Sequence, residues 1–162
     1  MAKKKEEKTN VMRVLEQKGI PFTPHTYPHE DGVAVDGVTV ARSMGQDPEC
    51  VFKTLVARGE RTGINVFCIP VCFELDLKKA AKAAGDKNME LIHVKELLGL
   101  TGYIRGGCSP IGMKKSFPTY IHSTCRLYDS IYVSAGVRGL QIRIAPDDLI
   151  RTTDASVVDL TV

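Results

Sequence analysis

Residues 102–115 read GYIRGGCSPIGMKK and lie between two apolar segments. Glycines let backbone amides approach a bound group closely, and successive amides can form a concavity that holds an anion or an oxyanion. Pro110 fixes its own φ angle and stiffens the loop. An ordinary Gly-Pro connection would explain these residues equally well. The positive charges of Arg105, Lys114 and Lys115 favour a site.

The composition is typical of one soluble globular domain. The chain has 162 residues, of which 43% are hydrophobic and 25% are charged. No apolar run is long enough to span a membrane, and no apolar segment follows the charged N-terminus as in a secretory signal. We therefore expect a cytoplasmic protein without membrane contact, with a disordered tail at residues 1–8 and one domain at 9–162. The net charge of +3 does not exclude RNA as a ligand, because an enzyme that binds an RNA end needs only a local basic patch.

Five cysteines are an odd number, which argues against a complete disulfide framework and favours a reducing compartment. Cys68 and Cys72 form a lone C-x3-C pair in an apolar segment, without a second pair at zinc-finger spacing. They are predicted to be buried structural thiols. No metal or cofactor is expected, since no dinucleotide-binding, P-loop or nucleophile-elbow motif is present.

Hydrophobic periodicity and turn residues predict short strands and short helices. Helices are predicted at residues 10–18, 38–44, 77–84, 93–100 and from 145 onward. Strands are predicted at residues 51–57, 64–69, 89–92, 117–121, 131–135, 140–144 and 157–162, after an extended edge segment at 20–27. Several strands are joined by hairpins. The expected fold is therefore α/β, of the α+β type, with a mixed, largely antiparallel sheet flanked by short helices.

An alternating aromatic cluster and one lysine stand out before any resemblance is considered. His25, Tyr27 and His29 alternate, so they share one face of an extended chain, either as a site or as a surface cluster. Lys53 is a charge inside the apolar run 51–57, and it either reaches solvent from a strand edge or is held for a purpose.

A basic stripe is predicted on the helix at 77–84. Lys78 and Lys82 are one turn apart and Lys79 is adjacent to Lys78. The stripe is either a solvated face or a contact for phosphate groups.

Five blocks of sequence, in order, resemble the YbaK/EbsC (ProX-like) aminoacyl-tRNA deacylases, most closely the YbaK type that hydrolyses Cys-tRNA(Pro). They are residues 25–27, 51–55, 77–81, 102–115 and 131–140. The resemblance covers nearly the whole chain from about Val11. It implies a partly barrel-like mixed sheet flanked by helices.

The resemblance also implies trans-editing: hydrolysis of the ester that links a small, mischarged amino acid to the 3′ end of tRNA(Pro). Such editing is needed where a synthetase cannot reject a similar side chain. For cysteine the implied mechanism is substrate-assisted, with the substrate's own thiol attacking its carbonyl. Aminoacyl-tRNA is then the partner, together with prolyl-tRNA synthetase as a possible second one.

The family's functional positions fall on particular residues of this chain. The implied catalytic groups are Lys53 and the amides of Gly106 and Gly107. The implied substrate-binding residues are Tyr27, Thr54, Ser109, Pro110, Ser134 and, carried over only weakly, Gln141. The expected phosphate contacts are Lys78, Lys79, Lys82, Lys114 and Lys115.

Three other functions stay open from the sequence. The first is a deacylase for another small residue, such as alanine on tRNA(Pro). The second is a non-catalytic module that binds tRNA or a synthetase. The third is an anion-binding domain for a small metabolite, which salt-insensitive binding would support.

Overall fold

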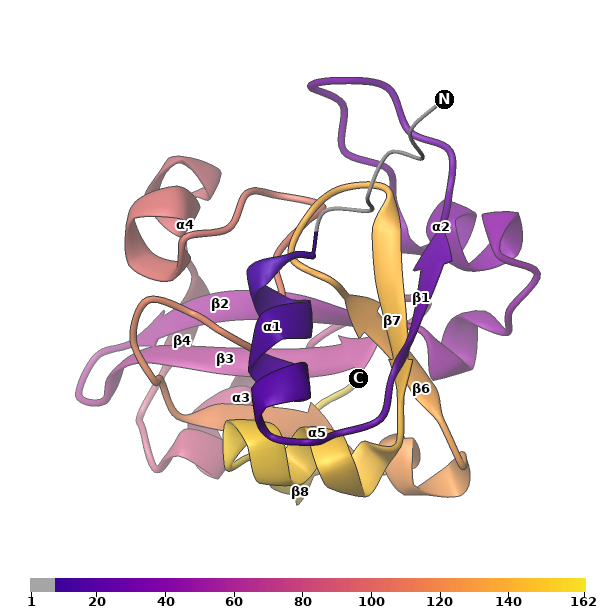
Figure 1. The fold of residues 1–162 in the computed structure, drawn as a ribbon. Helices are drawn as coiled ribbons and strands as arrows, with labels where there is room; N and C mark the ends of the chain where they lie inside the picture. Colours follow the sequence, from indigo (N-terminus) through magenta and orange to yellow (C-terminus); the bar gives the residue numbers. More distant parts are fainter. Residues whose placement is uncertain (1–7) are drawn as a thin grey trace, which may run out of the picture.

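The computed structural model describes residues 8–162, so most of the predicted tail lies outside the described residues. The helices are α1 (Asn10–Gln17), α2 (Gly37–Ser43), α3 (Leu77–Ala84), α4 (Val94–Thr101) and α5 (Pro146–Thr153) (Figure 1). The strands are β1 (Thr23–Thr26), β2 (Phe52–Gly59), β3 (Gly63–Pro70), β4 (Met89–Leu91), β5 (Thr119–His122), β6 (Ile131–Ser134), β7 (Leu140–Ile144) and β8 (Ser156–Val158). Short 3₁₀ segments lie at Pro48–Cys50 and Ser123–Leu127.

The strands form two sheets. One has the order β4-β2-β3-β5-β8 and the other β1-β7-β6. Four pairings are antiparallel, whereas β5 pairs parallel with β3 and with β8. A bridge between Val51 and Tyr132 joins the two sheets. The prediction of a mixed, largely antiparallel arrangement is confirmed.

Capping side chains and glycines with positive φ mark most of the helix ends. The Thr9 side chain accepts a hydrogen bond from the Met12 amide at the start of α1. Asp76 caps α3 in the same way, and Gly85 ends that helix with φ of 70°. Gly102 ends α4 with φ of 87°, and the glycine-rich loop starts there.

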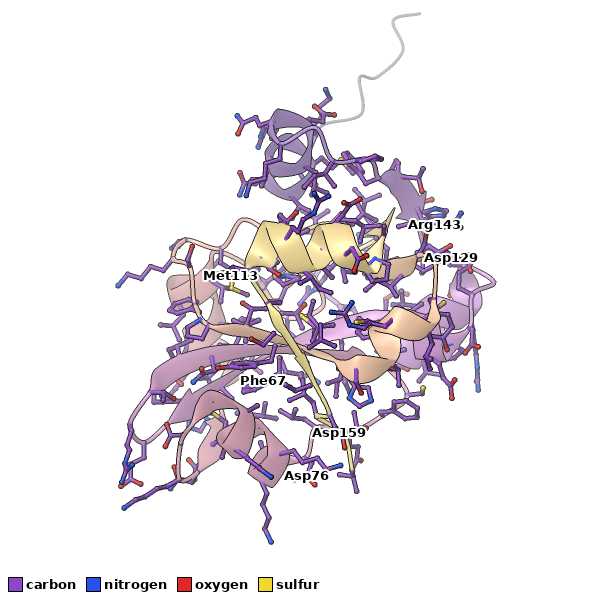
Figure 2. All side chains as sticks on the ribbon, turned by 90° about the horizontal axis from the view of Figure 1, so that it is seen from below. Phe67, Asp76, Met113, Asp129, Arg143 and Asp159 are labelled. Carbon is purple, nitrogen blue, oxygen red and sulfur yellow. The ribbon has the colours of Figure 1, made fainter. Side chains whose placement is uncertain are left out.

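Helices cover both faces of the larger sheet. α1 lies across β2 and β3 in Figure 1, and its residues Val11 and Leu15 are fully buried in the main core with Leu149 of α5. On the other side, Ala80 and Ala81 of α3 pack in a second core with residues of β2 and β3. Figure 2 shows this helix from below. The β2–β3 hairpin is therefore held between two cores, which gives Lys53 a rigid support.

Two sequence predictions differ from the structure. The final strand is only β8, because the chain then leaves the sheet and meets the segment before α3, where Thr161 bridges Leu75. Cys72 is exposed, since it lies in a turn beyond the end of β3; Cys68 is fully buried, as predicted.

Candidate functional site

One cavity of about 790 Å³ lies over the start of β2. Its walls come from β2, the loop before α2, the start of α4 and the glycine-rich loop, with contributions from Tyr27 just after β1 and from β6 and β7. Six residues predicted from the sequence to be functional line it: Tyr27, Lys53, Thr54, Gly106, Ser134 and Gln141. Segments far apart in the chain thus meet around one space large enough for an organic ligand.

Lys53 is half-buried on β2, opposite Ile69 of β3. Its side chain lines the cavity. Within residues 8–162 it forms no ion pair with a carboxylate. The ammonium group is therefore not engaged by a carboxylate of the described residues and is available to a ligand in the cavity.

The glycine-rich loop meets the cavity through a tight turn at residues 104–107. The Gly107 amide donates to the Ile104 carbonyl oxygen over 2.9 Å, and Gly106 has φ of 85°. A turn with positive φ at its third residue requires glycine there. The Cβ of an alanine at this position would lie 3.1 Å from the Ala34 Cβ. Gly106 is thus needed both for its backbone angle and for its close packing.

The backbone amides of the turn differ in their hydrogen bonding. The Gly107 amide is occupied by Ile104, and Gly107 does not line the cavity. Gly106 and Cys108 do line it, and within residues 8–162 neither amide donates a hydrogen bond. The Gly106 and Cys108 amides are therefore open to a ligand, whereas the Gly107 amide, which the sequence prediction also named, closes the turn.

Tyr27 fixes the turn from the opposite side. Its amide donates to the Gly139 carbonyl oxygen over 3.0 Å, which continues the pairing of β1 with β7. Its side chain is buried, and the hydroxyl donates to the Gly106 carbonyl oxygen over 3.5 Å. His25 of the predicted histidine–tyrosine cluster packs edge-on against Tyr132 instead.

Three polar side chains complete the wall. Thr54 contacts the Cys68 sulfur over 3.8 Å, and the Ser134 hydroxyl accepts a hydrogen bond from the Gly136 amide over 3.1 Å. Gln141 is opposite Ser134 in the β6–β7 pairing. Its side-chain oxygen is buried and has no hydrogen-bond partner among the described residues. Such an acceptor is satisfied when a ligand supplies a donor.

Ser109 and Pro110 are buried, but they do not line the cavity. The Ser109 hydroxyl accepts a hydrogen bond from the Ile111 amide over 3.3 Å. The Tyr103 hydroxyl donates to the Ile111 carbonyl oxygen. These contacts hold the loop at Ser109 and Ile111, outside the cavity wall.

Cys108 is the cysteine that lines the cavity. Burial raises the pKa of its thiol to about 12. A nucleophilic cysteine instead needs a lowered pKa to form a thiolate near neutral pH. Cys108 is therefore unsuited to act as a protein nucleophile.

The five lysines predicted to contact phosphate lie outside the cavity wall. Figure 2 shows Asp159 beside α3, and the Lys79 amine is bound to the Asp159 carboxylate (2.8 Å) and the Thr161 carbonyl oxygen (2.7 Å). Lys78, Lys82, Lys114 and Lys115 are exposed. The stripe on α3 thus contains one lysine with a structural role.

Much of the remaining wall was not identified from the sequence. The loop at residues 32–37 and the apolar residues Val94 and Leu97 of α4 are part of it. Arg105, whose charge the sequence analysis noted beside the turn, also lines the cavity. Asp36 also contributes, and hydrogen bonds from the Thr39 hydroxyl and amide lower the pKa of its carboxyl group. The cap signal Asp36-x-x-Thr39 was present in the sequence, but it indicates a helix start and not a cavity.

None of the helices within residues 8–162 has the length and apolar character needed to cross a membrane. No three His, Cys, Asp or Glu side chains in this range are grouped so that they could hold a metal ion.

A mixed α/β domain whose cavity joins a lysine to free backbone amides defines a class of ligand-binding or acyl-transfer domains. Comparison with known proteins is more specific. Residues 33–152 match the family model of the aminoacyl-tRNA editing domain. EbsC of Enterococcus faecalis, whose name makes it a candidate Cys-tRNA(Pro)/Cys-tRNA(Cys) deacylase, is 48% identical over 99% of this chain and 98% of its own. The chain belongs to the aminoacyl-tRNA editing domain family.

Solved structures have the same fold. A candidate trans-editing enzyme for prolyl-tRNA synthetase is 26% identical, with a TM-score of 0.82 over 94% of this chain and 95% of that one. The hypothetical protein APE2540 is 20% identical, with a TM-score of 0.84 over 95% of this chain and 100% of that one. The second likeness concerns the fold alone.

Proposed function

We propose that this protein is a trans-editing deacylase that hydrolyses the ester of mischarged Cys-tRNA(Pro). The observation that carries the proposal is the meeting of Lys53 and the Gly106 turn in one cavity. The similarity to EbsC along nearly the whole chain supports the choice of substrate. Prolyl-tRNA synthetase, as the enzyme that produces the mischarged tRNA, is the proposed partner, and the cytoplasm is the proposed location.

In the proposed reaction the substrate supplies the nucleophile. Its side-chain sulfur, after loss of the thiol proton to solvent, attacks its own carbonyl carbon and forms a carbon–sulfur bond. The bond to the ribose oxygen breaks, and that oxygen takes up a proton. Water then opens the resulting thiolactone to free cysteine. An intramolecular attack gains from proximity, and the raised pKa of the Cys108 thiol agrees with a mechanism that uses no protein thiolate.

The protein's part is to stabilise charge and to orient the ester. The free amides of Gly106 and Cys108 are proposed to hold the carbonyl oxygen as negative charge develops on it. The Lys53 ammonium adds positive charge and positions the terminal ribose. Tyr27, Thr54, Ser134 and Gln141 line the same space and are proposed to orient the aminoacyl group.

Deacylation of a panel of mischarged tRNAs, with and without prolyl-tRNA synthetase, tests the proposal. Hydrolysis of Cys-tRNA(Pro) should exceed that of Ala-tRNA(Pro), because alanine has no thiol to attack its own ester. Faster hydrolysis of the alanyl ester would refute the thiol mechanism and point to the alternative substrate. Binding of tRNA without any hydrolysis would instead indicate a non-catalytic module.

A further inference from the structure

The cavity edge beside the Gly106 turn carries positive charge that the proposed chemistry does not use. Arg105 lines the cavity and is exposed. Among the described residues, Lys53 and Asp36 are the other charged residues of the wall. The Asp36 carboxylate already accepts hydrogen bonds from the Thr39 amide (3.1 Å) and hydroxyl (2.6 Å). The edge is therefore available to an anionic group.

A second arginine is held against the first. The Arg138 Nε donates to the Arg105 carbonyl oxygen over 2.8 Å. A Cβ on Gly107 would lie 3.1 Å from backbone atoms of the 136–139 turn, so this turn and the 104–107 turn pack main chain against main chain. The two arginines thus belong to one rigid edge, although 33 positions separate them in sequence.

Both guanidinium groups are without an acidic partner. Within residues 8–162, neither Arg105 nor Arg138 forms an ion pair with a carboxylate. An apolar side chain precedes each of them, Ile104 (43% exposed) and Val137 (45% exposed). A planar guanidinium matches the oxygens of a phosphodiester, and the apolar neighbours can contact a ribose or a base. The edge therefore combines charge for a phosphate with apolar surface for a ribose or a base.

We infer that Arg105 and Arg138 form the docking site for the phosphodiester backbone at the 3′ end of the RNA substrate. The inference rests on the proposed function, which places the terminal ribose ester beside Lys53. The preceding phosphodiester then lies at the mouth of the cavity, where Arg105 is. The lysines of α3 do not line this cavity, so they are less suited to contact the last phosphates.

The test is the Arg105→Ala variant of the full chain, with two readouts. The first is the affinity for an acceptor-stem RNA minihelix that ends in CCA and carries no amino acid. It is measured by fluorescence anisotropy over a series of salt concentrations. The second is hydrolysis of 3′-O-cysteinyl adenosine, an ester without phosphate. We expect the minihelix Kd to rise about tenfold and the slope of log affinity against log salt to become shallower by about 1. Hydrolysis of the phosphate-free ester should stay within about twofold, because Arg105 contacts the phosphate and not the ester.

Two further variants complete the test. Arg13→Ala removes an exposed arginine of α1 outside the cavity and should leave both readouts unchanged. Arg105→Lys keeps the positive charge. Its slope of log affinity against log salt should match that of the native protein, and its affinity for the minihelix should lie between those of the native protein and Arg105→Ala. An unchanged Kd for Arg105→Ala, or an equal loss of phosphate-free hydrolysis, would overturn the inference. If the native protein hydrolyses neither Cys-tRNA(Pro) nor 3′-O-cysteinyl adenosine, the proposed function fails. The affinity for the minihelix still decides whether Arg105 belongs to a docking site for RNA.

Discussion

The Tyr27 hydroxyl donates to the Gly106 carbonyl oxygen over 3.5 Å, across 79 positions of sequence. Both residues line the cavity. Tyr27 belongs to the edge strand segment that pairs with β7, and Gly106 is the third residue of the turn at 104–107. This contact joins the two parts of the site that the sequence could only suggest separately.

Loss of that hydroxyl should reduce activity more than stability. A hydrogen bond this long contributes about 1 kcal/mol or less, so Tyr27→Phe should fold normally. Hydrolysis of Cys-tRNA(Pro) should fall about tenfold in single-turnover assays, since the turn loses its tie to the chain just after β1. Tyr103→Phe is the control: its hydroxyl bonds to Ile111 behind the loop, outside the cavity, so activity per folded molecule should persist. Equal losses in both variants would contradict a site role for Tyr27.

Gly106→Ala should lose both stability and activity. Its φ of 85° is unfavourable for alanine by about 1–2 kcal/mol, and the added Cβ meets Ala34. The control is Gly45→Ala, because Gly45 has φ of 68° with no atom within 4 Å of the built Cβ. Chemical denaturation should show a lower free energy of unfolding for both variants, but only Gly106→Ala should abolish hydrolysis. An active Gly106→Ala protein would exclude the turn from the mechanism.

Cys108→Ala should retain hydrolysis within about threefold, because the raised pKa keeps the thiol protonated at neutral pH. In the native protein, alkylation should reach the exposed Cys72 well before the buried Cys108. Mass spectrometry of peptides after brief alkylation measures this order. A Cys108→Ala protein that binds tRNA but has no turnover would show that the protein, and not the substrate, supplies the sulfur nucleophile.

Stability should decrease as the pH falls below about 6.5, in part because of His122. Burial lowers the pKa of this histidine below its ordinary value of 6.5, although Asp159 opposes the shift and Lys79 adds to it. Its Nδ1 accepts a hydrogen bond from the Leu160 amide over 3.0 Å, which requires an unprotonated nitrogen. The unfolded chain therefore binds more protons in this window, so the stabilisation is complete above pH 6.5 and is lost down to the folded-state pKa.

Thermal unfolding between pH 7.5 and 5 measures this effect. His122→Asn keeps a hydrogen-bond acceptor near the Leu160 amide but does not titrate. Its melting temperature should fall less over the pH range than that of the native protein. Identical pH dependence in the two proteins would exclude His122 as a source of the acid sensitivity.

Features set by neighbouring residues could be predicted from the sequence. Asp76 and Gly85 bound α3 as expected, because a cap and a left-handed glycine act over a single turn. The hairpin of β6 and β7 was equally clear from its alternation and its glycines.

Features that depend on tertiary packing could not be predicted. Nothing local shows that the 32–37 loop closes over β2, or that Asp159 lies beside Lys79, 80 positions away. Which amide of the Gly106–Gly107 pair is free depends on the conformation of the turn. The resemblance identified the loop, and only the folded structure separates the amide that closes the turn from the neighbouring amides that form no hydrogen bond within residues 8–162.

The most direct test of the central claim is single-turnover deacylation of Cys-tRNA(Pro) by Lys53→Ala. Its control is Lys87→Ala, which removes the same charge from an exposed position away from the cavity. We predict that Lys53→Ala folds normally and hydrolyses the ester at least about 100-fold more slowly, a loss of about 2.7 kcal/mol of transition-state stabilisation, while Lys87→Ala matches the native rate. A Lys53→Ala protein with near-native turnover would contradict the account.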